Sequence, residues 1–174
     1  DAFVNLPAGA EAEAVRVIDG ALCVAKYPFI VVYPSRDGRG RRCWPCRKLA
    51  AVARRLVKDG IAERFVVVGE EEEGRQWNAS ADDDGTAINL AGRLSIGAVG
   101  ALLARAKLVL GSDGGLMHVA GALGRPLVDI GEGVPLRYLP AGTQTVMICS
   151  GGAFRRTTRG VERLSDVGCD GKEV

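Results

Sequence analysis

The stretch that decides the fold is Leu108-Val-Leu-Gly-Ser-Asp-Gly-Gly-Leu-Met-His-Val-Ala-Gly-Ala-Leu-Gly-Arg-Pro-Leu-Val-Asp129. Leu108 to Leu110 close an apolar run that is typical of a buried strand. Glycines follow at once, and glycine permits a sharp turn and a close approach of the backbone to a ligand. A helix is expected to begin near Leu116 and to end at Gly124, because Pro126 just beyond is a stop signal. The stretch therefore predicts a strand, a tight turn and a helix.

The predicted turn gathers several chemical groups. Asp113 lies in the turn, and the only histidine of the chain, His118, falls in the first turn of the helix. The exposed N–H groups at a helix start attract anions, and phosphate is the usual one in biology. Since open α/β sheets bind ligands at the carboxyl ends of their strands, we expect a ligand site at this turn.

Strands and helices alternate over the rest of the chain. Such alternation predicts βαβ units, and therefore an α/β fold with a parallel sheet covered by helices on both faces. Right-handed crossovers then bring the loops 35–42, 70–76 and 112–118 to one edge of the sheet. After the acidic run Glu70 to Glu73 we expect a polar loop up to Gly85. The predicted strands are Phe29–Tyr33, Arg64–Gly69, Ile88–Gly92, the run at Leu108, Leu127–Ile130 and Thr143–Ile148, and the predicted helices lie near residues 8–19, 45–60, 95–106 and 116–124.

The length of 174 residues fits one domain with attached segments. We expect a lead-in or linker at 1–27, the domain at 28–150 and an irregular tail at 151–174. Residues of hydrophobic type make up 47% of the chain, enough for a core, and a net charge of +2 argues against a general nucleic-acid surface. No apolar run approaches the roughly 18 residues of a membrane span.

Two further expectations concern the cellular setting. The start at Asp1 has no basic region, so we expect no secretory signal and either a processed protein or an excised fragment. The five cysteines are an odd number and are spread over the chain. This favours reduced thiols in a cytoplasmic protein over a disulfide framework.

Ser112 to Pro126 resembles the donor-site motif of the heptosyltransferases, glycosyltransferase family nine, whose typical pattern is "nDsGpmHlAaAlGtP". Val31-Val-Tyr-Pro-Ser35 resembles the family's "vvhPga", and Arg42-Cys-Trp-Pro45 resembles its "K-x-W-P". Asn89-Leu-Ala-Gly92, with Ser95 after it, resembles "nLaGkts". These matches follow the order of the family and cover roughly residues 28 to 131.

The resemblance implies the GT-B architecture, in which two Rossmann-like domains hold the active site between them. It covers the C-terminal, donor-binding half, and no segment here matches the N-terminal half that binds the acceptor and supplies an aspartate as the proposed base. The implied function is that of the donor-binding domain of an inverting glycosyltransferase, with an ADP-heptose-like donor and a lipopolysaccharide or other glycan acceptor. The isolated chain is expected to be inactive. The implied partners are the nucleotide-diphosphate sugar, the acceptor domain and a lipid-linked acceptor as the one membrane contact, with no nucleic acid, no metal and no other cofactor.

The resemblance also implies roles for residues at the diphosphate. Ser35 and Arg42 would contact it, and a guanidinium can grip phosphate oxygens bidentately. The amides of Gly114 and Gly115 would bind phosphate, so that the chain stabilises the departing diphosphate. The implied catalytic set is Arg42, Asp113 and His118.

Other implied roles lie around the sugar and the ribose. Asp113 would lie near the sugar or the diphosphate, and His118 would support the phosphate site. One of Glu71, Glu72 and Glu73 would accept hydrogen bonds from ribose hydroxyls, with the register left open between them. The chain departs from the family after the fifth strand, where Glu132 adds a negative charge near the expected diphosphate.

Simpler alternatives stand beside these roles. Asp113 as a helix cap, His118 as a structural residue and the acidic run as a solvated loop are each consistent with the sequence. Cys43-Trp-Pro-Cys46 before a helix also fits a thiol redox motif. A zinc site would need two more ligands, and the other cysteines lack the paired spacing of structural zinc. A nucleotide-sugar-binding module without catalysis is a further alternative.

Overall fold

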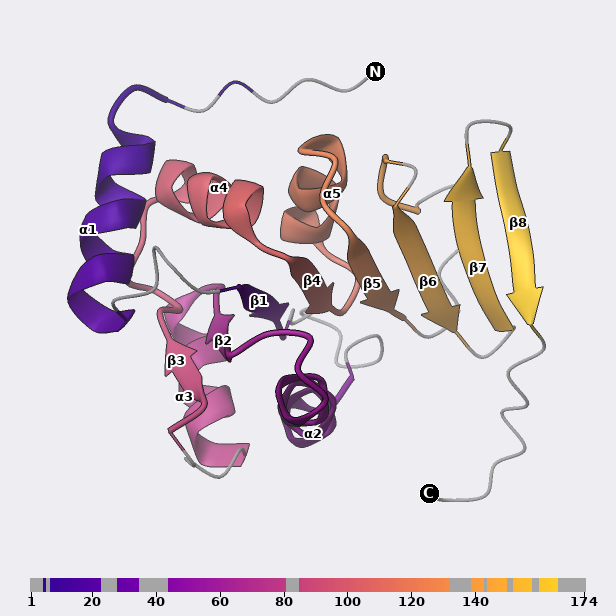
Figure 1. The fold of residues 1–174 in the computed structure, drawn as a ribbon, viewed down its shortest axis with the longest axis horizontal. Helices are drawn as coiled ribbons and strands as arrows, with labels where there is room; N and C mark the ends of the chain where they lie inside the picture. Colours follow the sequence, from indigo (N-terminus) through magenta and orange to yellow (C-terminus); the bar gives the residue numbers. More distant parts are fainter. Residues whose placement is uncertain are drawn as a thin grey trace.

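A computed structural model describes residues 5, 7–22, 28–34, 44–80, 85–131, 139–142, 144–149, 152–157 and 160–165. Within these ranges, eight strands form one sheet in the order β3-β2-β1-β4-β5-β6-β7-β8 (Figure 1). Six of the strands run parallel, and the last two pair antiparallel. The strands are β1 (Phe29–Tyr33), β2 (Arg64–Val67), β3 (Ala87–Asn89), β4 (Leu108–Gly111), β5 (Leu127–Ile130), β6 (Thr145–Cys149), β7 (Gly152–Thr157) and β8 (Gly160–Ser165).

The strand order reverses beside β1. The chain moves outward from β1 to β2 and β3, then returns to the other side of β1 with β4 and continues to β5 and β6. In open parallel sheets such a switch point opens a crevice at the carboxyl ends of the two strands. The sequence prediction of an α/β fold with a parallel sheet is confirmed, and β1 and β4 mark where a ligand is expected.

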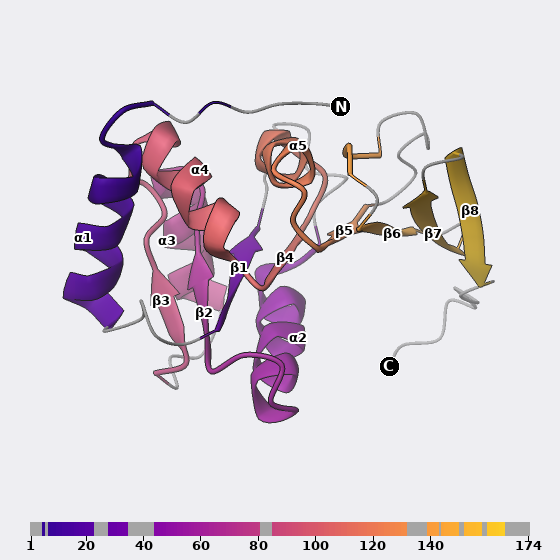
Figure 2. The ribbon, with the colours of Figure 1, turned by 45° about the horizontal axis from the view of Figure 1, so that its top comes forward.

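Helices cover both faces of the parallel part of the sheet (Figures 1 and 2). The alternation along each strand explains the two layers, because Phe29 and Val31 belong to one apolar cluster and Ile30 and Val32 to the other. The first cluster includes residues of α1 (Ala10–Leu22), α4 (Ile96–Arg105) and α5 (Gly115–Ala122). The second includes residues of α2 (Cys46–Lys58) and α3 (Glu71–Ser80).

Helix α1 packs on α4, far along the chain. The N-cap of α4 is Ser95, as its position in the sequence predicts, and its Oγ accepts a hydrogen bond from the N–H of Ala98 at 3.2 Å. Glu13 of α1 accepts hydrogen bonds from the N–H and the hydroxyl of the same serine, at 3.0 and 2.6 Å. These bonds lower the pKa of the Glu13 carboxyl. The lead-in helix thus holds the start of α4.

The prediction of a loop after the acidic run was wrong, because Glu71–Ser80 forms helix α3. The sequence shows little apolar periodicity there, since Trp77 is the one large apolar side chain of the segment. Trp77 is buried against Phe65 of β2, with ring centroids 5.9 Å apart in an edge-to-face arrangement. Glu73 accepts a hydrogen bond from the N–H of Glu70 at 2.7 Å. One aromatic anchor and one local cap stabilise this polar helix.

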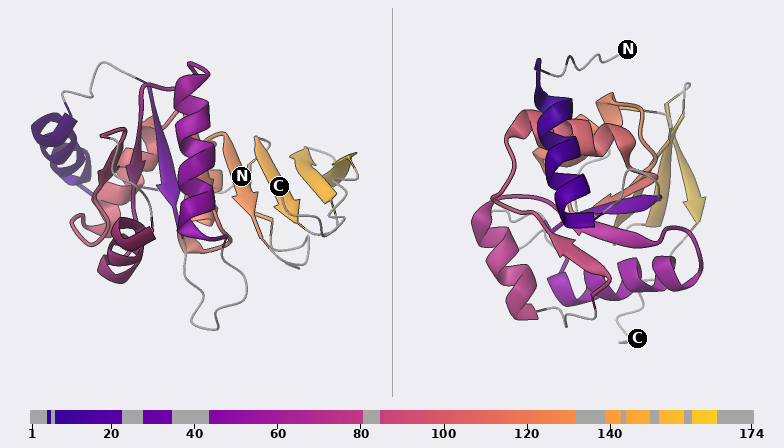
Figure 3. Two further views of the ribbon diagram at one scale, coloured as in Figure 1. Left: turned by 90° about the horizontal axis from the view of Figure 1, so that it is seen from below. Right: turned by 60° about the vertical axis from the view of Figure 1, so that its left-hand side comes forward.

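The expectation of an irregular tail was also wrong for residues 152–157 and 160–165, which form a hairpin at the sheet edge. Figure 3 shows β6, β7 and β8 extending beyond the layer of described helices. The hairpin is held by backbone pairing to β6 and by an ion pair between Arg155 and Glu162. Backbone hydrogen bonds between strands depend little on the side-chain pattern, so the periodicity of the sequence did not predict this hairpin.

Candidate functional site

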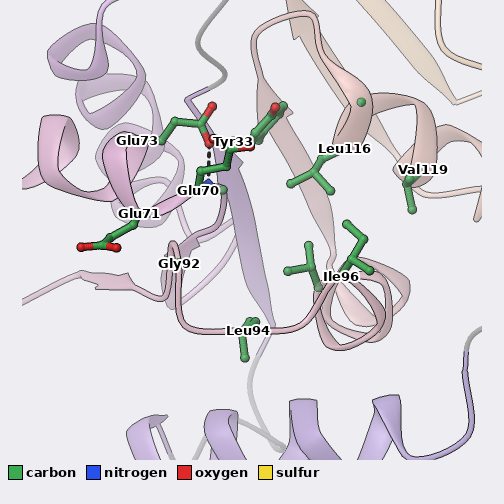
Figure 4. Close-up of a pocket in the computed structure, with 12 residues that line it drawn as sticks. Tyr33, Glu70, Glu71, Glu73, Gly92, Leu94, Ile96, Leu116 and Val119 are labelled. Carbon is green, nitrogen blue, oxygen red and sulfur yellow. Dashed lines mark hydrogen bonds between the residues drawn. The ribbon is translucent and has the colours of Figure 1, made fainter.

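A pocket of about 620 Å³ opens at the carboxyl edge of the sheet, beside the switch point between β1 and β4 (Figure 4). It lies between the starts of α3, α4 and α5, with β1 at its base. A volume in this range suits a small ligand or the nucleoside part of a larger one. The pocket is lined by Tyr33, Gly69, Glu70, Glu71, Glu73, Gly92, Leu94, Ile96, Val99, Gly115, Leu116 and Val119.

One wall of the pocket is apolar. Leu94 lies just before α4, Ile96 and Val99 lie in its first turn, and Leu116 and Val119 come from α5. Ile96 is 73% exposed, although burial of an isoleucine side chain away from water is favourable. An exposed apolar side chain that faces a concave surface is a feature of ligand sites. This wall can cover the flat face of a planar ring.

The opposite wall is acidic and belongs to the first turn of α3. Glu73 is only 5% exposed, and its Oε2 accepts the hydrogen bond from Glu70 described above. A Cβ on Gly69 would lie 2.1 Å from that same Oε2, so the glycine leaves room for the carboxylate. Glu73 therefore shapes the turn that leads into the wall.

The structure distinguishes Glu71 from Glu72. Both pair with Arg75, Glu71 at 3.1 Å and Glu72 at 2.8 Å, and these hydrogen bonds and charges raise the pKa of Arg75. Glu71 lines the pocket, whereas Glu72 is not one of the lining residues. Of the three carboxylates that the sequence left as alternatives, Glu71 and Glu73 line the pocket and Glu72 does not. Oε2 of Glu73 already accepts the hydrogen bond from Glu70, whereas Glu71 pairs only with the exposed Arg75 in the described structure.

The segment after β3 packs closely against the start of α3. A Cβ on Gly92 would lie 2.7 Å from the Cα of Glu71, and the N–H of Gly92 donates to the carbonyl of Gly69 at 2.8 Å. The Nδ2 group of Asn89 donates to the carbonyl of Gly74 at 2.9 Å. Asn89 and Gly92, which both belong to the Asn89–Gly92 motif, therefore hold the acidic wall in position through their contacts with α3 and with Gly69.

The turn between β4 and α5 is held by a buried serine. Ser112 is fully buried, and its Oγ accepts a hydrogen bond from the N–H of Trp44 at 2.9 Å. The N-cap of α5 is Gly114, with extended backbone and no side-chain hydrogen bond to the helix. Gly115 lines the pocket, and a Cβ there would meet nothing within 4 Å. The first amides of α5 therefore stand beside open space, where an anion can approach.

Asp113 and His118 both lie at this end of α5. Asp113 is half-buried and precedes the N-cap, so the alternative in which it caps the helix finds no support in the geometry. His118 is exposed in the first turn of α5 and is not among the residues that line the pocket. The structure brings Asp113, Gly114 and Gly115 together at one edge of the pocket, with His118 one turn along.

Asp129, which the sequence analysis did not single out, lies in the same region. Its side chain is fully buried on β5, and neither carboxylate oxygen has a hydrogen-bond partner among the described residues. Burial first, and the nearby charge of Asp113 second, raise the pKa of Asp129 to about 7. The signal available in the sequence was an aspartate inside the apolar strand run Leu127–Ile130.

Several predicted site residues fall in other parts of the chain. Ser35, Arg42 and Cys43 lie outside the described residues, and so does Glu132. Cys46, the other half of the redox motif considered above, is half-buried at the start of α2. The described part of the chain holds no group of three or more His, Cys, Asp or Glu side chains suited to a metal ion. None of its helices has the length and apolar character required to cross a bilayer.

Comparison with known proteins places this geometry in a family. The sequence profile of glycosyltransferase family 9 (heptosyltransferase) matches residues 5–160. Lipopolysaccharide heptosyltransferase 2 of Salmonella typhimurium is 33% identical over 108 residues, which are 59% of this chain and 30% of that protein. The chain thus spans about a third of the length of that relative.

Solved structures show the same fold. The ADP-heptose lipopolysaccharide heptosyltransferase II of Escherichia coli superposes with a TM-score of 0.69 at 24% identity, covering 84% of this chain and 44% of that one. The Escherichia coli heptosyltransferase WaaC with ADP-2-deoxy-2-fluoro heptose gives a TM-score of 0.56 at 23% identity, covering 75% of this chain and 40% of that one.

Proposed function

The chain belongs to glycosyltransferase family 9, the heptosyltransferases, and from this premise we propose that it is the donor-binding domain of an inverting glycosyltransferase that uses a nucleotide-diphosphate sugar. The observation that carries the proposal is the pocket beside the β1–β4 switch point, with an apolar wall, an acidic wall and the start of a helix at its edge. Nucleotides bind at this position in open α/β sheets.

The polarity of the pocket suggests how the nucleotide lies. Ionised carboxylates only accept hydrogen bonds, so Glu71 suits ribose hydroxyls and repels phosphates. The start of α5 carries N–H donors and the positive end of the helix dipole, so it suits the diphosphate. The base then lies between Leu116 and the side chains at the start of α4. The nucleotide therefore runs from the acidic wall to the turn at Gly114.

The family supports ADP-heptose as the donor, since one solved relative is described with an ADP-heptose analogue. The acceptor is a lipopolysaccharide or another glycan, in keeping with the names of the relatives. The acceptor would bind on a separate N-terminal domain, which also supplies the base.

In the transfer step, the acceptor oxygen forms a bond to C1 of the sugar as the bond from C1 to the diphosphate oxygen breaks. Negative charge moves onto the diphosphate, and the acceptor proton goes to the base on the other domain. The part of this chain is to stabilise that charge with the first amides of α5 and with Arg42, aided by Ser35. Asp113 would position the sugar or the turn, and His118 would support the phosphate site.

The test is isothermal titration of the full chain with ADP, UDP and GDP. We expect one diphosphate to bind selectively, and Arg42→Ala to lose at least about tenfold in affinity, because a guanidinium contact to a phosphate contributes a kcal/mol or more. Ile96→Ser should also lose about tenfold, since it removes apolar cover from the base. Its effect on stability should be small, because Ile96 is exposed in the free protein.

Matched controls come from the opposite edge of the sheet. Arg64 is an exposed arginine at the start of β2, and Ile61 is an isoleucine that is 39% exposed before the same strand. Arg64→Ala and Ile61→Ser should bind the diphosphate like the wild type. Equal losses in the site variants and in these controls, or no binding of any diphosphate, would refute the proposed donor site.

A further inference from the structure

Asp129 is the one buried carboxyl group of the described chain whose two oxygens both lack a hydrogen-bond partner. A charged carboxylate in such a place is costly, because burial removes water and no donor replaces it. The carboxyl group is buried at a lower cost in free energy when it is protonated and therefore neutral. The protonation of Asp129 therefore responds to any charge that is placed near it.

The position of Asp129 brings it close to the candidate site. Asp129 pairs in register with Gly111 on β4 and with Met147 on β6, so its side chain shares their face of the sheet. That face is the one covered by α5, since a Cβ on Gly111 would meet the sulfur of Met117 at 2.9 Å. Gly111 leads directly into the turn at Asp113. Asp129 thus lies next to the strand that carries the proposed diphosphate site.

The charged and titratable groups around Asp129 are few in the described structure. Asp113 in the turn adds a like charge, and together with burial it brings the pKa of Asp129 to about 7. His118 is the one ionisable residue of α5, and Cys149 the one of β6. On β7, the guanidinium of Arg156 donates to the carbonyls of Leu139 and Pro140, at 2.6 and 2.9 Å. No described cation is therefore paired with Asp129.

We propose that Asp129 takes up a proton from solvent when a diphosphate occupies the turn before α5, so that donor binding is coupled to pH. The proposal rests on the proposed function, because it requires a diphosphate at this turn. A diphosphate brings further negative charge to a place that already holds Asp113, and the nearby buried carboxyl then keeps its proton to higher pH. By linkage, the donor binds more tightly where Asp129 is protonated.

The experiment is titration of the full chain with ADP-heptose between pH 6 and 9, in pairs of buffers that differ in ionisation enthalpy. Both phosphates of this probe are esterified, so the probe itself does not titrate in this range. We expect the wild type to take up as much as one proton per donor bound near pH 8. Its affinity should fall by up to tenfold per pH unit above pH 7. Asp129→Asn should bind with little proton uptake and a flat pH profile.

His118 supplies the decisive control, because histidines in general change charge between pH 5 and 8. His118→Gln should keep the proton uptake per donor bound at pH 8 that Asp129→Asn loses, even where its role at the phosphate site lowers its affinity. Uptake that disappears in His118→Gln and persists in Asp129→Asn would overturn the proposal. So would binding of ADP-heptose to the wild type without proton uptake, which needs no variant to fold. Absence of binding at every pH would instead refute the proposed donor site.

Discussion

At the scale of single residues, three polar side chains stand out because they are buried although the apolar pattern of the sequence does not predict their burial. Ser112, Glu73 and Asp129 are all buried within or beside the candidate site. Ser112 accepts a backbone hydrogen bond from Trp44, and Glu73 accepts one from Glu70, so each is satisfied by the local fold. Asp129 is the exception among these described residues, and its ionisation should therefore affect stability as well as binding.

We expect Asp129→Asn to stabilise the protein at alkaline pH. The carboxyl has an ordinary pKa of 3.8 in the unfolded chain and a pKa of about 7 in the folded chain. Between these values the folded chain binds more protons, so the free energy of unfolding falls as the pH rises through this window and levels off above pH 7. Asparagine cannot ionise, so the variant should gain on the order of 4 kcal/mol over the wild type at pH 8.5.

Urea unfolding at pH 4 and pH 8.5 measures this effect. At pH 4 the carboxyl is mostly protonated in the folded chain, and the two proteins should differ by less than at pH 8.5. A difference that is the same at both pH values would mean that Asp129 does not change its charge in this range.

At the scale of elements, the site depends on the contact between the segment after β3 and the start of α3. Gly92 makes that contact possible, because it has φ of +73° and its absent Cβ leaves room for Glu71. The same segment donates a hydrogen bond to Gly69. A side chain at Gly92 would push the acidic wall away from the pocket.

We therefore expect Gly92→Ala to lower the free energy of unfolding by about 3 kcal/mol, from backbone strain and overpacking together. Gly60→Ala is the matched control, since Gly60 has φ of +74° and a methyl group added there would meet nothing within 4 Å. That variant should lose only about 1 kcal/mol, from the backbone alone. Denaturant unfolding compares the two. Equal losses would show that the contact with Glu71 contributes nothing.

At the scale of the whole molecule, the described helices cover the parallel part of the sheet and do not extend over β7 and β8. β1 and β4 are paired on both sides and lie between the two helix layers, whereas β8 is an edge strand whose residues 160–164 are exposed. The local stability of a strand follows its burial and pairing. The hairpin of β7 and β8 should therefore open without unfolding the parallel sheet.

Hydrogen exchange followed by mass spectrometry tests this division. After correction for intrinsic rates, amides of β8 should exchange on the order of a hundredfold faster than those of β1 and β4. The central strands should exchange only with global unfolding. Protection of β8 equal to that of β1 would show instead that the hairpin and the parallel sheet unfold as one unit.

The family assignment from Ser112 to Pro126 is confirmed, and so is the α/β fold with its parallel sheet. The N-cap at Ser95 is confirmed as well. The domain boundaries at 27/28 and 150/151 and the roles of Ser35, Arg42, Asp113 and His118 stay predictions. The helix at Glu71–Ser80 and the hairpin were missed, because one buried tryptophan and a backbone ladder decide them.

By itself the sequence determined the six parallel strands, the helices α1, α2, α4 and α5, the position of the turn before α5 and the family. Local physics accounts for this, because apolar periodicity, glycine turns and helix caps act over a few residues of chain. Only the tertiary structure decided that Glu71 rather than Glu72 lines the pocket, that Ile96 faces it, and that Asp129 is buried next to Gly111. Those facts depend on strand register and helix packing, which join residues far apart in the chain and leave no local pattern.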